Sequence, residues 1–157
     1  MENNEVEILL VEDNPHEAQL TIRALRKQNL SSRLLHLDDG LEALDFLFSK
    51  GKYENSNSSS TLKLILLDLK LPKIGGIEIL RQIKSDVRTQ LIPVVILTSS
   101  REEQDVYNCY AFGANSYIVK PVEFEQFSKT IGETGLYWMK LNMPRSIISI
   151  KETGTIS

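Results

Sequence analysis

The segment VEILLVEDNP (Val6–Pro15) joins a strand signal directly to a helix signal. The apolar run Val6–Val11 is broken by a single glutamate, which is typical of a strand buried on both faces of a parallel sheet. Asn14 is a favourable N-cap residue, Pro15 suits the first helical position, and Glu17 stands where a capping-box acid belongs. The segment therefore predicts a strand, a short acidic loop and a helix, the first half of a βαβ unit.

Strand and helix signals alternate along the rest of the chain. Apolar runs predict four more strands, at residues 34–37, 64–67, 93–97 and 116–119, and each is followed by an amphipathic helical pattern. Five strands alternating with five helices imply an α/β fold. Its parallel sheet is covered by helices on both faces and joined by right-handed crossovers.

Composition restricts the class of protein. The chain has 157 residues, 41% of them hydrophobic and 25% charged, which fits one globular domain. Its net charge of −3 gives no overall basic field to attract nucleic acid, so we expect no direct DNA binding. Its one cysteine, Cys109, excludes an intrachain disulfide and indicates a reducing compartment. The apolar runs are too short to span a membrane and the N-terminus is acidic, so we expect a cytoplasmic protein.

Two segments interrupt the alternation. Residues 50–62 are polar and rich in serine and asparagine, which predicts a mobile loop. Residues 142–157 combine a proline, an apolar β-branched patch and a polar end, and they are too few for a second domain. We therefore predict one domain over residues 1–141 and a C-terminal extension over residues 142–157.

The unusual residues gather where the predicted strands end. Ligands of open α/β sheets bind outside the carboxyl ends of the strands, and parallel strands end at one edge. The residues at the ends of the first, third, fourth and fifth strands are acids, a hydroxyl and an amine: Glu12 and Asp13, Asp68, Thr98, and Lys120. We expect these side chains to lie close together.

Three carboxylates at one edge need a counter-charge. Like charges push one another towards protonation unless a cation binds, and Mg²⁺ suits clustered oxygens because it uses few protein ligands and keeps several waters. Lys120 and Thr98 can then offer a positive charge and a hydrogen-bond donor to a phosphoryl group. Asp68, the most central carboxylate, is the candidate nucleophile, because carboxylates can form aspartyl-phosphate intermediates.

Each of these residues has an ordinary structural explanation when taken alone. Asp13 can favour the dipole of the following helix, Asp68 can form a turn, and Lys120 can be a surface lysine. These explanations must all hold at matching strand ends, which favours a shared site. His16 and His36 have no cysteine or histidine partner at metal-ligand spacing, so we interpret them as solvated and structural respectively.

The set of residues at the strand ends also resembles a known family. Glu12-Asp13, Asp68, Thr98 and Lys120-Pro121 are similar, in this order, to the motif set of two-component response-regulator receiver domains. The resemblance covers nearly all of residues 5–140. Supporting matches are Pro72, Gly76, Ala114 and Tyr117.

This resemblance implies a fold and a partner. The fold is a five-stranded doubly wound parallel sheet of strand order 2-1-3-4-5, like the chemotaxis receiver. Asp68 would accept a phosphoryl group from a phosphohistidine on a sensor histidine kinase. As a phosphoacceptor, the chain would not be an enzyme beyond promoting its own phosphotransfer and dephosphorylation.

The resemblance also implies roles for the other residues. Asp13 and Asp68 would hold Mg²⁺ together with the backbone carbonyl of Lys70, and Glu12 would act mainly through water. Thr98 would bond to a phosphoryl oxygen and Lys120 would pair with it, and Tyr117 would act as an aromatic switch. The peptide bond between Lys120 and Pro121 is expected to be cis, as in the family.

A narrower resemblance concerns response regulators that partner cyanobacterial phytochrome kinases. The long polar loop, the lack of an output domain, and the Tyr137-Trp138…Asn142…Pro144 extension are similar to those regulators. They tend to self-associate, so the resemblance implies a homodimer with Trp138 as an anchor. It also implies a phytochrome kinase as the partner.

Other functions of the same architecture fit less well. A haloacid-dehalogenase-like phosphatase needs a second acid two residues after its nucleophile, where this chain has Lys70. A flavodoxin-like domain needs a Gly/Ser/Thr-rich phosphate loop where this chain has Glu12-Asp13-Asn14. A pseudo-receiver, a dimerisation or interaction module that is never phosphorylated, stays an alternative, although such modules usually lose an acid or the lysine. A DNA-binding regulator would need more chain after Lys120.

Overall fold

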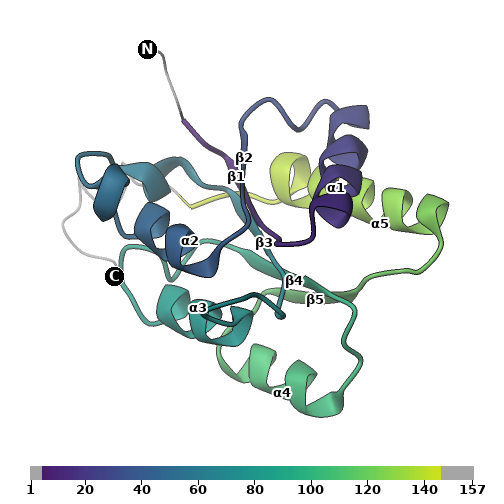
Figure 1. Ribbon diagram of the computed structural model, residues 1–157. Coiled ribbons are helices and arrows are strands. Elements are labelled where there is room, and N and C mark those ends of the chain that lie inside the picture. Colours follow the sequence, from purple (N-terminus) through teal and green to yellow (C-terminus); the bar gives the residue numbers. More distant parts are fainter. Residues whose placement is uncertain (1–4, 146–157) are drawn as a thin grey trace.

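The computed structural model describes residues 5–145, and a five-stranded parallel sheet runs through its centre (Figure 1). The strand order is β2-β1-β3-β4-β5, which confirms the predicted fold class and order. The strands are β1 (Ile8–Val11), β2 (Leu34–Leu37), β3 (Leu64–Leu67), β4 (Val94–Thr98) and β5 (Ser116–Val119).

Within residues 5–145, five α-helices cover the two faces of the sheet. Helices α1 and α5 pack on one face, and α2, α3 and α4 pack on the other (Figure 1). None of the helices within residues 5–145 is long and apolar enough to cross a membrane. Their bounds are α1 (Pro15–Lys27), α2 (Gly40–Leu47), α3 (Gly76–Lys84), α4 (Glu103–Ala111) and α5 (Phe124–Leu136).

The central strands are buried on both faces. In β1, Leu9 packs into the core beneath α2–α4, and Leu10 packs into the core beneath α1 and α5. In β3, Ile65 and Leu66 divide in the same way, because successive side chains of a strand point to opposite faces. This double burial explains why the strands are continuous apolar runs and not alternating ones.

Two predicted strand limits differ from the structure. The first strand begins at Ile8, and the fourth covers Val94–Thr98 instead of 93–97. Pro93 still accepts a hydrogen bond from the backbone N–H of Ile65, but proline has no N–H to continue the ladder. Thr98 is thus the last residue of β4 and not the first residue after it.

The predicted loop at residues 50–62 contains two 3₁₀ helices, Gly51–Tyr53 and Ser58–Thr61. The ring of Tyr53 packs edge-on against Phe46 of α2, with 5.3 Å between centroids. The guanidinium of Arg145 donates to the carbonyl oxygen of Ser59 at 3.1 Å. The mobility of the loop stays a prediction, and the predicted extension lies outside the described residues from position 146 onward.

At the amino edge of the sheet, one lysine ties three segments together. The Nζ of Lys84, the last residue of α3, donates to the carbonyl oxygens of Gln90 and Ile92 at 3.1 and 2.7 Å. It also donates to Oδ1 of Asn115, at 2.9 Å, just before β5. The same Oδ1 accepts the backbone N–H of Val94 at 2.8 Å. Lys84 therefore fixes the end of α3 to the starts of β4 and β5.

The start of α3 depends on the absence of a side chain at Gly76. A Cβ at this position would lie 2.2 Å from the carbonyl oxygen of Asp68 and 2.7 Å from the Cα of Leu69. Both are backbone atoms and cannot rotate away. The glycine therefore allows the helix to begin against the loop that carries Asp68.

We predict that Gly76→Ala lowers the free energy of unfolding by about 1–3 kcal/mol, because the added methyl overlaps backbone. Helix propensity alone predicts the opposite sign, since alanine favours helix. The neighbouring Gly75→Ala is the matched control: its Cβ would meet only the carbonyl oxygen of Leu69, at an ordinary 3.7 Å. Urea unfolding of both variants measures the difference, and equal midpoints would contradict the prediction.

Candidate functional site

Three carboxylates meet at the carboxyl edge of the sheet. Oxygen atoms of Glu12, Asp13 and Asp68 all lie within 4.8 Å of one another. The parallel register causes this meeting, because Val11 of β1 pairs with Leu67 of β3 and the next residue of each strand lies at the same level. The side chains of Glu12 and Asp68 are only 2% and 10% exposed, whereas Asp13 is exposed.

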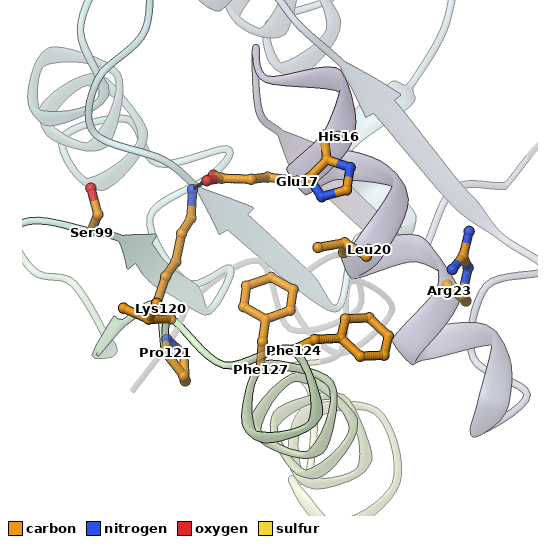
Figure 2. A pocket seen from close by; sticks show the side chains of 10 residues that line it. His16, Glu17, Leu20, Arg23, Ser99, Lys120, Pro121, Phe124 and Phe127 are labelled. Carbon is orange, nitrogen blue, oxygen red and sulfur yellow. Dashed lines mark hydrogen bonds and ion pairs between the residues drawn. The ribbon is translucent and has the colours of Figure 1, made fainter.

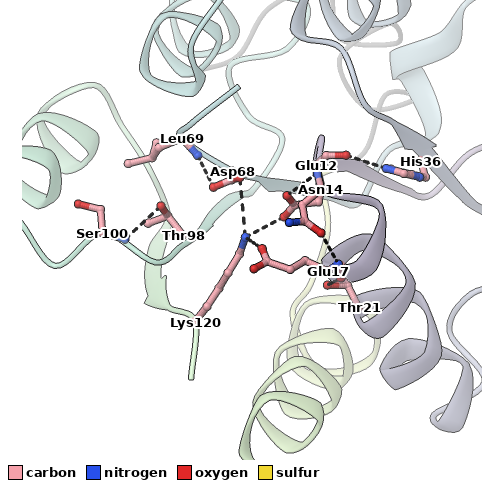
Figure 3. Close-up of polar contacts among 10 residues, drawn as sticks. All are labelled: Glu12, Asn14, Glu17, Thr21, His36, Asp68, Leu69, Thr98, Ser100 and Lys120. Atoms are coloured by element: carbon pink, nitrogen blue, oxygen red, sulfur yellow. Dashed lines mark hydrogen bonds and ion pairs between the residues drawn. The ribbon is translucent and has the colours of Figure 1, made fainter. Parts of the chain in front are cut away.

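The ammonium group of Lys120 enters the same pocket from the end of β5 (Figure 3). Its Nζ donates to Oε1 of Glu12 at 2.8 Å and lies 3.7 Å from Oδ2 of Asp68. The backbone N–H of Lys120 donates to the carbonyl oxygen of Thr98 at 2.8 Å, which extends the β4–β5 ladder to the pocket. The lysine side chain is 8% exposed, so this charge is buried among acids.

Thr98 is fully buried at the end of β4. Its Oγ1 accepts the backbone N–H of Ser100 at 3.3 Å. Because a hydroxyl both accepts and donates, this contact leaves the O–H of Thr98 able to donate to a ligand at the sheet edge. Figure 3 shows Thr98 beside Asp68 on the side away from Glu12.

The prediction of a cis peptide bond between Lys120 and Pro121 is wrong, because no peptide bond among the described residues is cis. The trans form of an X–Pro bond is intrinsically favoured by about 0.5–1 kcal/mol, and the observed bond follows this preference. The four-carbon stem of Lys120 reaches Glu12 from a trans backbone.

Glu17 reaches the pocket, and the sequence analysis missed this role. Its backbone N–H donates to Oδ1 of Asn14, which confirms the predicted N-cap. Its carboxylate does not complete a capping box. Instead, Oε1 accepts a hydrogen bond from Nζ of Lys120 at 2.5 Å. An acid in the first helical turn at the ligand-binding edge was the available signal, and it was interpreted as a cap alone.

Burial and opposing charges set the protonation of these groups. Burial raises the pKa of Glu12 to about 7, although the hydrogen bond from Lys120 pulls it downward. Burial also raises the pKa of Asp68, against the charge of Lys120 and the backbone N–H of Leu69, which lies 2.8 Å from Oδ1. Burial alone would lower the pKa of Lys120, but Glu12, Glu17 and Asp68 together raise it.

The donor set fits a hard divalent cation. Three carboxylates supply oxygen ligands, which Mg²⁺ prefers, and the exposure of Asp13 leaves room for the waters that Mg²⁺ retains. Lys70 follows two residues after Asp68 in the loop at this edge, and the ligand role of its carbonyl stays a prediction. His36 lies next to this site but serves the backbone, since its Nε2 contacts the carbonyl oxygen of Glu12 at 2.8 Å.

Tyr117 lies on β5 beneath α4, half-buried against the core of that face. Its hydroxyl donates to the carbonyl oxygen of Ser100 at 3.0 Å, so the polar tip is satisfied. This bond links β5 to the loop that follows Thr98. The proposed switching role of Tyr117 is not tested by this contact.

A cavity of about 650 Å³ lies beside the pocket, between α1 and the start of α5 (Figure 2). Leu20, Phe124 and Phe127 form its apolar part. Glu17 and Lys120 line the end nearest the carboxylates, and Figure 2 shows their charged groups meeting there. The pocket therefore has an open side next to the Glu17–Lys120 pair.

Comparisons with known proteins agree with this geometry. A family model described as "Response regulator receiver domain" matches residues 8–132. The probable methanogenesis regulatory protein FilR2 of Methanothrix harundinacea is 41% identical over 135 residues, covering 86% of this chain and 84% of that protein.

Two solved structures each cover 90% of this chain and 99% of their own. The phosphorylated cyanobacterial phytochrome response regulator RcpA has a TM-score of 0.83 at 35% identity. The Mn²⁺-bound form of response regulator Rcp1 has a TM-score of 0.83 at 36% identity.

We predict that Mg²⁺ binding weakens as the pH falls below about 7. The raised pKa of Glu12 means that this side chain carries a proton below that pH, and a protonated carboxyl no longer helps to attract the cation. Calorimetric titration should show up to about tenfold lower affinity for each unit of pH below the pKa. Equal affinity at mildly alkaline and mildly acidic pH would contradict the prediction.

Two aspartate-to-asparagine variants test whether Mg²⁺ binds at the three carboxylates. Asp13→Asn removes one carboxylate of the triad and should greatly weaken Mg²⁺ binding. Asp38→Asn removes an exposed acid just after β2, at the same edge of the sheet but outside the triad, and should leave binding unchanged.

Proposed function

Because the chain belongs to the response regulator receiver domain family, we propose that Asp68 accepts a phosphoryl group from a sensor histidine kinase in a two-component phosphorelay. The observation that carries this proposal is the pocket itself. The carboxylate of Asp68 lies with those of Glu12 and Asp13, and 3.7 Å from the ammonium of Lys120. A receiver domain of this kind is a phosphoacceptor and not a classical enzyme.

The transfer step is a nucleophilic displacement at phosphorus. A carboxylate oxygen of Asp68 forms the new P–O bond, and the P–N bond of the donor phosphohistidine breaks. The electron pair of the broken bond goes to the imidazole nitrogen, which takes a proton from solvent. The hydrogen bond from the N–H of Leu69 to Oδ1 of Asp68 holds the carboxylate in one orientation for this attack.

Glu12, Asp13 and Asp68, with the carbonyl of Lys70, are the residues that would hold Mg²⁺. When bound, the cation supplies positive charge that offsets the crowded carboxylates and the incoming phosphoryl group. The donor chemistry of the triad and the Mn²⁺-bound form of the relative Rcp1 support this assignment.

Lys120 and Thr98 would bind the phosphoryl oxygens from the other side. The ammonium of Lys120 pairs with one oxygen and the hydroxyl of Thr98 donates to another, which compensates the charge on the transferred group. Movement of Thr98 towards the phosphoryl group draws its loop inward. The hydroxyl of Tyr117 donates a hydrogen bond to the carbonyl oxygen of Ser100 in this loop, at 3.0 Å. We therefore propose Tyr117 as the side chain that changes position when the loop moves.

The narrower proposal concerns the partner. The similarity to RcpA, a phytochrome response regulator, supports a phytochrome kinase as the phosphodonor. Both partners would be cytoplasmic, and output would come through protein contacts and not through direct DNA binding. The net charge of −3 gives no overall basic field that would attract DNA.

We also propose that the chain forms a homodimer through the extension at residues 142–157 and Trp138. Trp138 packs partly against the α1–α5 core and edge-on against the more exposed Tyr137, with 4.9 Å between centroids. An aromatic pair at the end of a helix suits an interface anchor.

Incubation with Mg²⁺ and acetyl phosphate should add the mass of one phosphoryl group to the chain. Asp68→Asn should add none, because the neutral amide is a much poorer nucleophile than the carboxylate. Asp38→Asn is the control, since that exposed acid lies outside the triad, and it should be phosphorylated like the original chain. Intact-mass spectrometry reads all three, and equal mass gain in Asp68→Asn would refute the proposal.

Sedimentation of the full chain at micromolar concentration tests the dimer. We expect a dimer in at least one of two conditions, with Asp68 unphosphorylated or with Asp68 phosphorylated. A monomer under both conditions would remove the homodimer proposal and leave the phosphorylation proposal intact.

A further inference from the structure

Lys120 has a third carboxylate partner that does not belong to the metal triad. Its Nζ lies 2.5 Å from Oε1 of Glu17, nearer than the 2.8 Å to Glu12 and the 3.7 Å to Asp68. Glu17 comes from the first turn of α1, so this contact joins a helix to the end of β5. In the unphosphorylated chain, the ammonium is thus engaged mainly by two glutamates and not by Asp68.

The backbone of Glu17 is held independently of its carboxylate. Its N–H donates to Oδ1 of Asn14 at 3.0 Å, and its carbonyl oxygen accepts the hydroxyl of Thr21 at 2.9 Å. Neither bond uses the carboxylate. The helix therefore presents this side chain to Lys120 from a fixed position, and the side chain can change without removing the cap.

The carboxylate of Glu17 also has room to move. Its side chain is 38% exposed, in contrast to the buried Glu12 at 2%, and it lines the cavity of about 650 Å³ (Figure 2). A half-exposed glutamate can release a partner and be solvated at low cost, whereas a buried one cannot. Of the two glutamates, Glu17 is therefore the one whose ion pair with Lys120 can break at low cost.

We infer that Glu17 is a positioning residue that holds Lys120 in the resting chain and releases it when Asp68 is phosphorylated. The inference rests on the proposed phosphorylation of Asp68. The phosphoryl oxygens must compete with Glu17 for the ammonium, so the contact stabilises the unphosphorylated state relative to the transition state for phosphorylation. Once Lys120 has moved to the phosphoryl group, Glu17 no longer affects it, so hydrolysis of the phosphoryl group is independent of Glu17.

Two substitutions at Glu17 test this role. Glu17→Gln keeps the length but removes the charge, and Glu17→Asp keeps the charge but shortens the side chain so that it no longer reaches Nζ. Both should be phosphorylated by acetyl phosphate about threefold to tenfold faster than the original chain, because both weaken the hold on Lys120. After the donor is removed, both should lose the phosphoryl group within about twofold of the original rate.

The experiment follows intact mass over time with Mg²⁺ and acetyl phosphate. The carboxylate of Asp68 forms the new P–O bond while the P–O bond of the donor breaks and acetate leaves with the electron pair. Glu125→Gln, which removes an exposed acid from the first turn of α5 at the same edge, is the control and should behave like the original chain. Urea unfolding of each variant verifies that it is folded.

The outcomes separate the two proposals. If the original chain gains no phosphoryl mass, the proposed function fails and the role of Glu17 fails with it. If the original chain is phosphorylated and either Glu17 variant is no faster, the holding role is wrong. A faster Glu17→Gln with an unchanged Glu17→Asp would assign the effect to charge repulsion of the anionic donor. Equal acceleration of phosphorylation and dephosphorylation would also overturn the inference, since it would place Glu17 in the transition state.

Discussion

The parallel pairing of β1, β3, β4 and β5 is the constraint from which the site follows. Val11 pairs with Leu67, and Thr98 pairs with Val119, so the residues after these positions arrive at one level. Each contributing side chain sits within one or two residues of the end of its strand. The loops have little freedom to displace these residues, because β1, β3 and β4 are buried on both faces and β5 is paired with β4. Chemistry at the edge is therefore positioned by the packing of the core.

The pocket brings together more negative charge than its own lysine balances. Glu12, Asp13 and Asp68 lie together, and Glu17 adds a fourth acid against the single ammonium of Lys120. Burial of Glu12 and Asp68 makes their ionised forms unfavourable, as the raised pKa of each shows. A bound cation would neutralise the excess of carboxylates, and an anionic phosphoryl group would pair with the ammonium of Lys120.

The sequence was sufficient for features governed by local pattern and strand order. The structure agrees with the predicted strand limits at 34–37, 64–67 and 116–119 and with the predicted N-cap at Asn14. These features were predictable because strands of a parallel sheet are runs of apolar residues and because N-caps favour a few residue types. The sequence signal placed Glu17 at the ligand-binding edge, but it did not determine which group its carboxylate contacts. A first-turn glutamate can turn back to its own helix or reach across to another strand, and only the distance to Lys120 decides between the two. The trans bond before Pro121 was missed for a different reason, since a family expectation replaced the intrinsic preference of the peptide bond.

The hydrogen bonds of Lys84 at the amino edge of the sheet determine how one side of α4 is held. Lys84 secures α3 and the first residues of β4 and β5 at the edge of the sheet opposite the acidic pocket. Helix α4 is preceded by the loop whose Ser100 accepts a hydrogen bond from Tyr117. It is followed by the segment that Asn115 fixes at the start of β5. Helix α4 is therefore anchored on its C-terminal side through the entry to β5, and on its N-terminal side it is connected to the acidic pocket through the loop that carries Ser100.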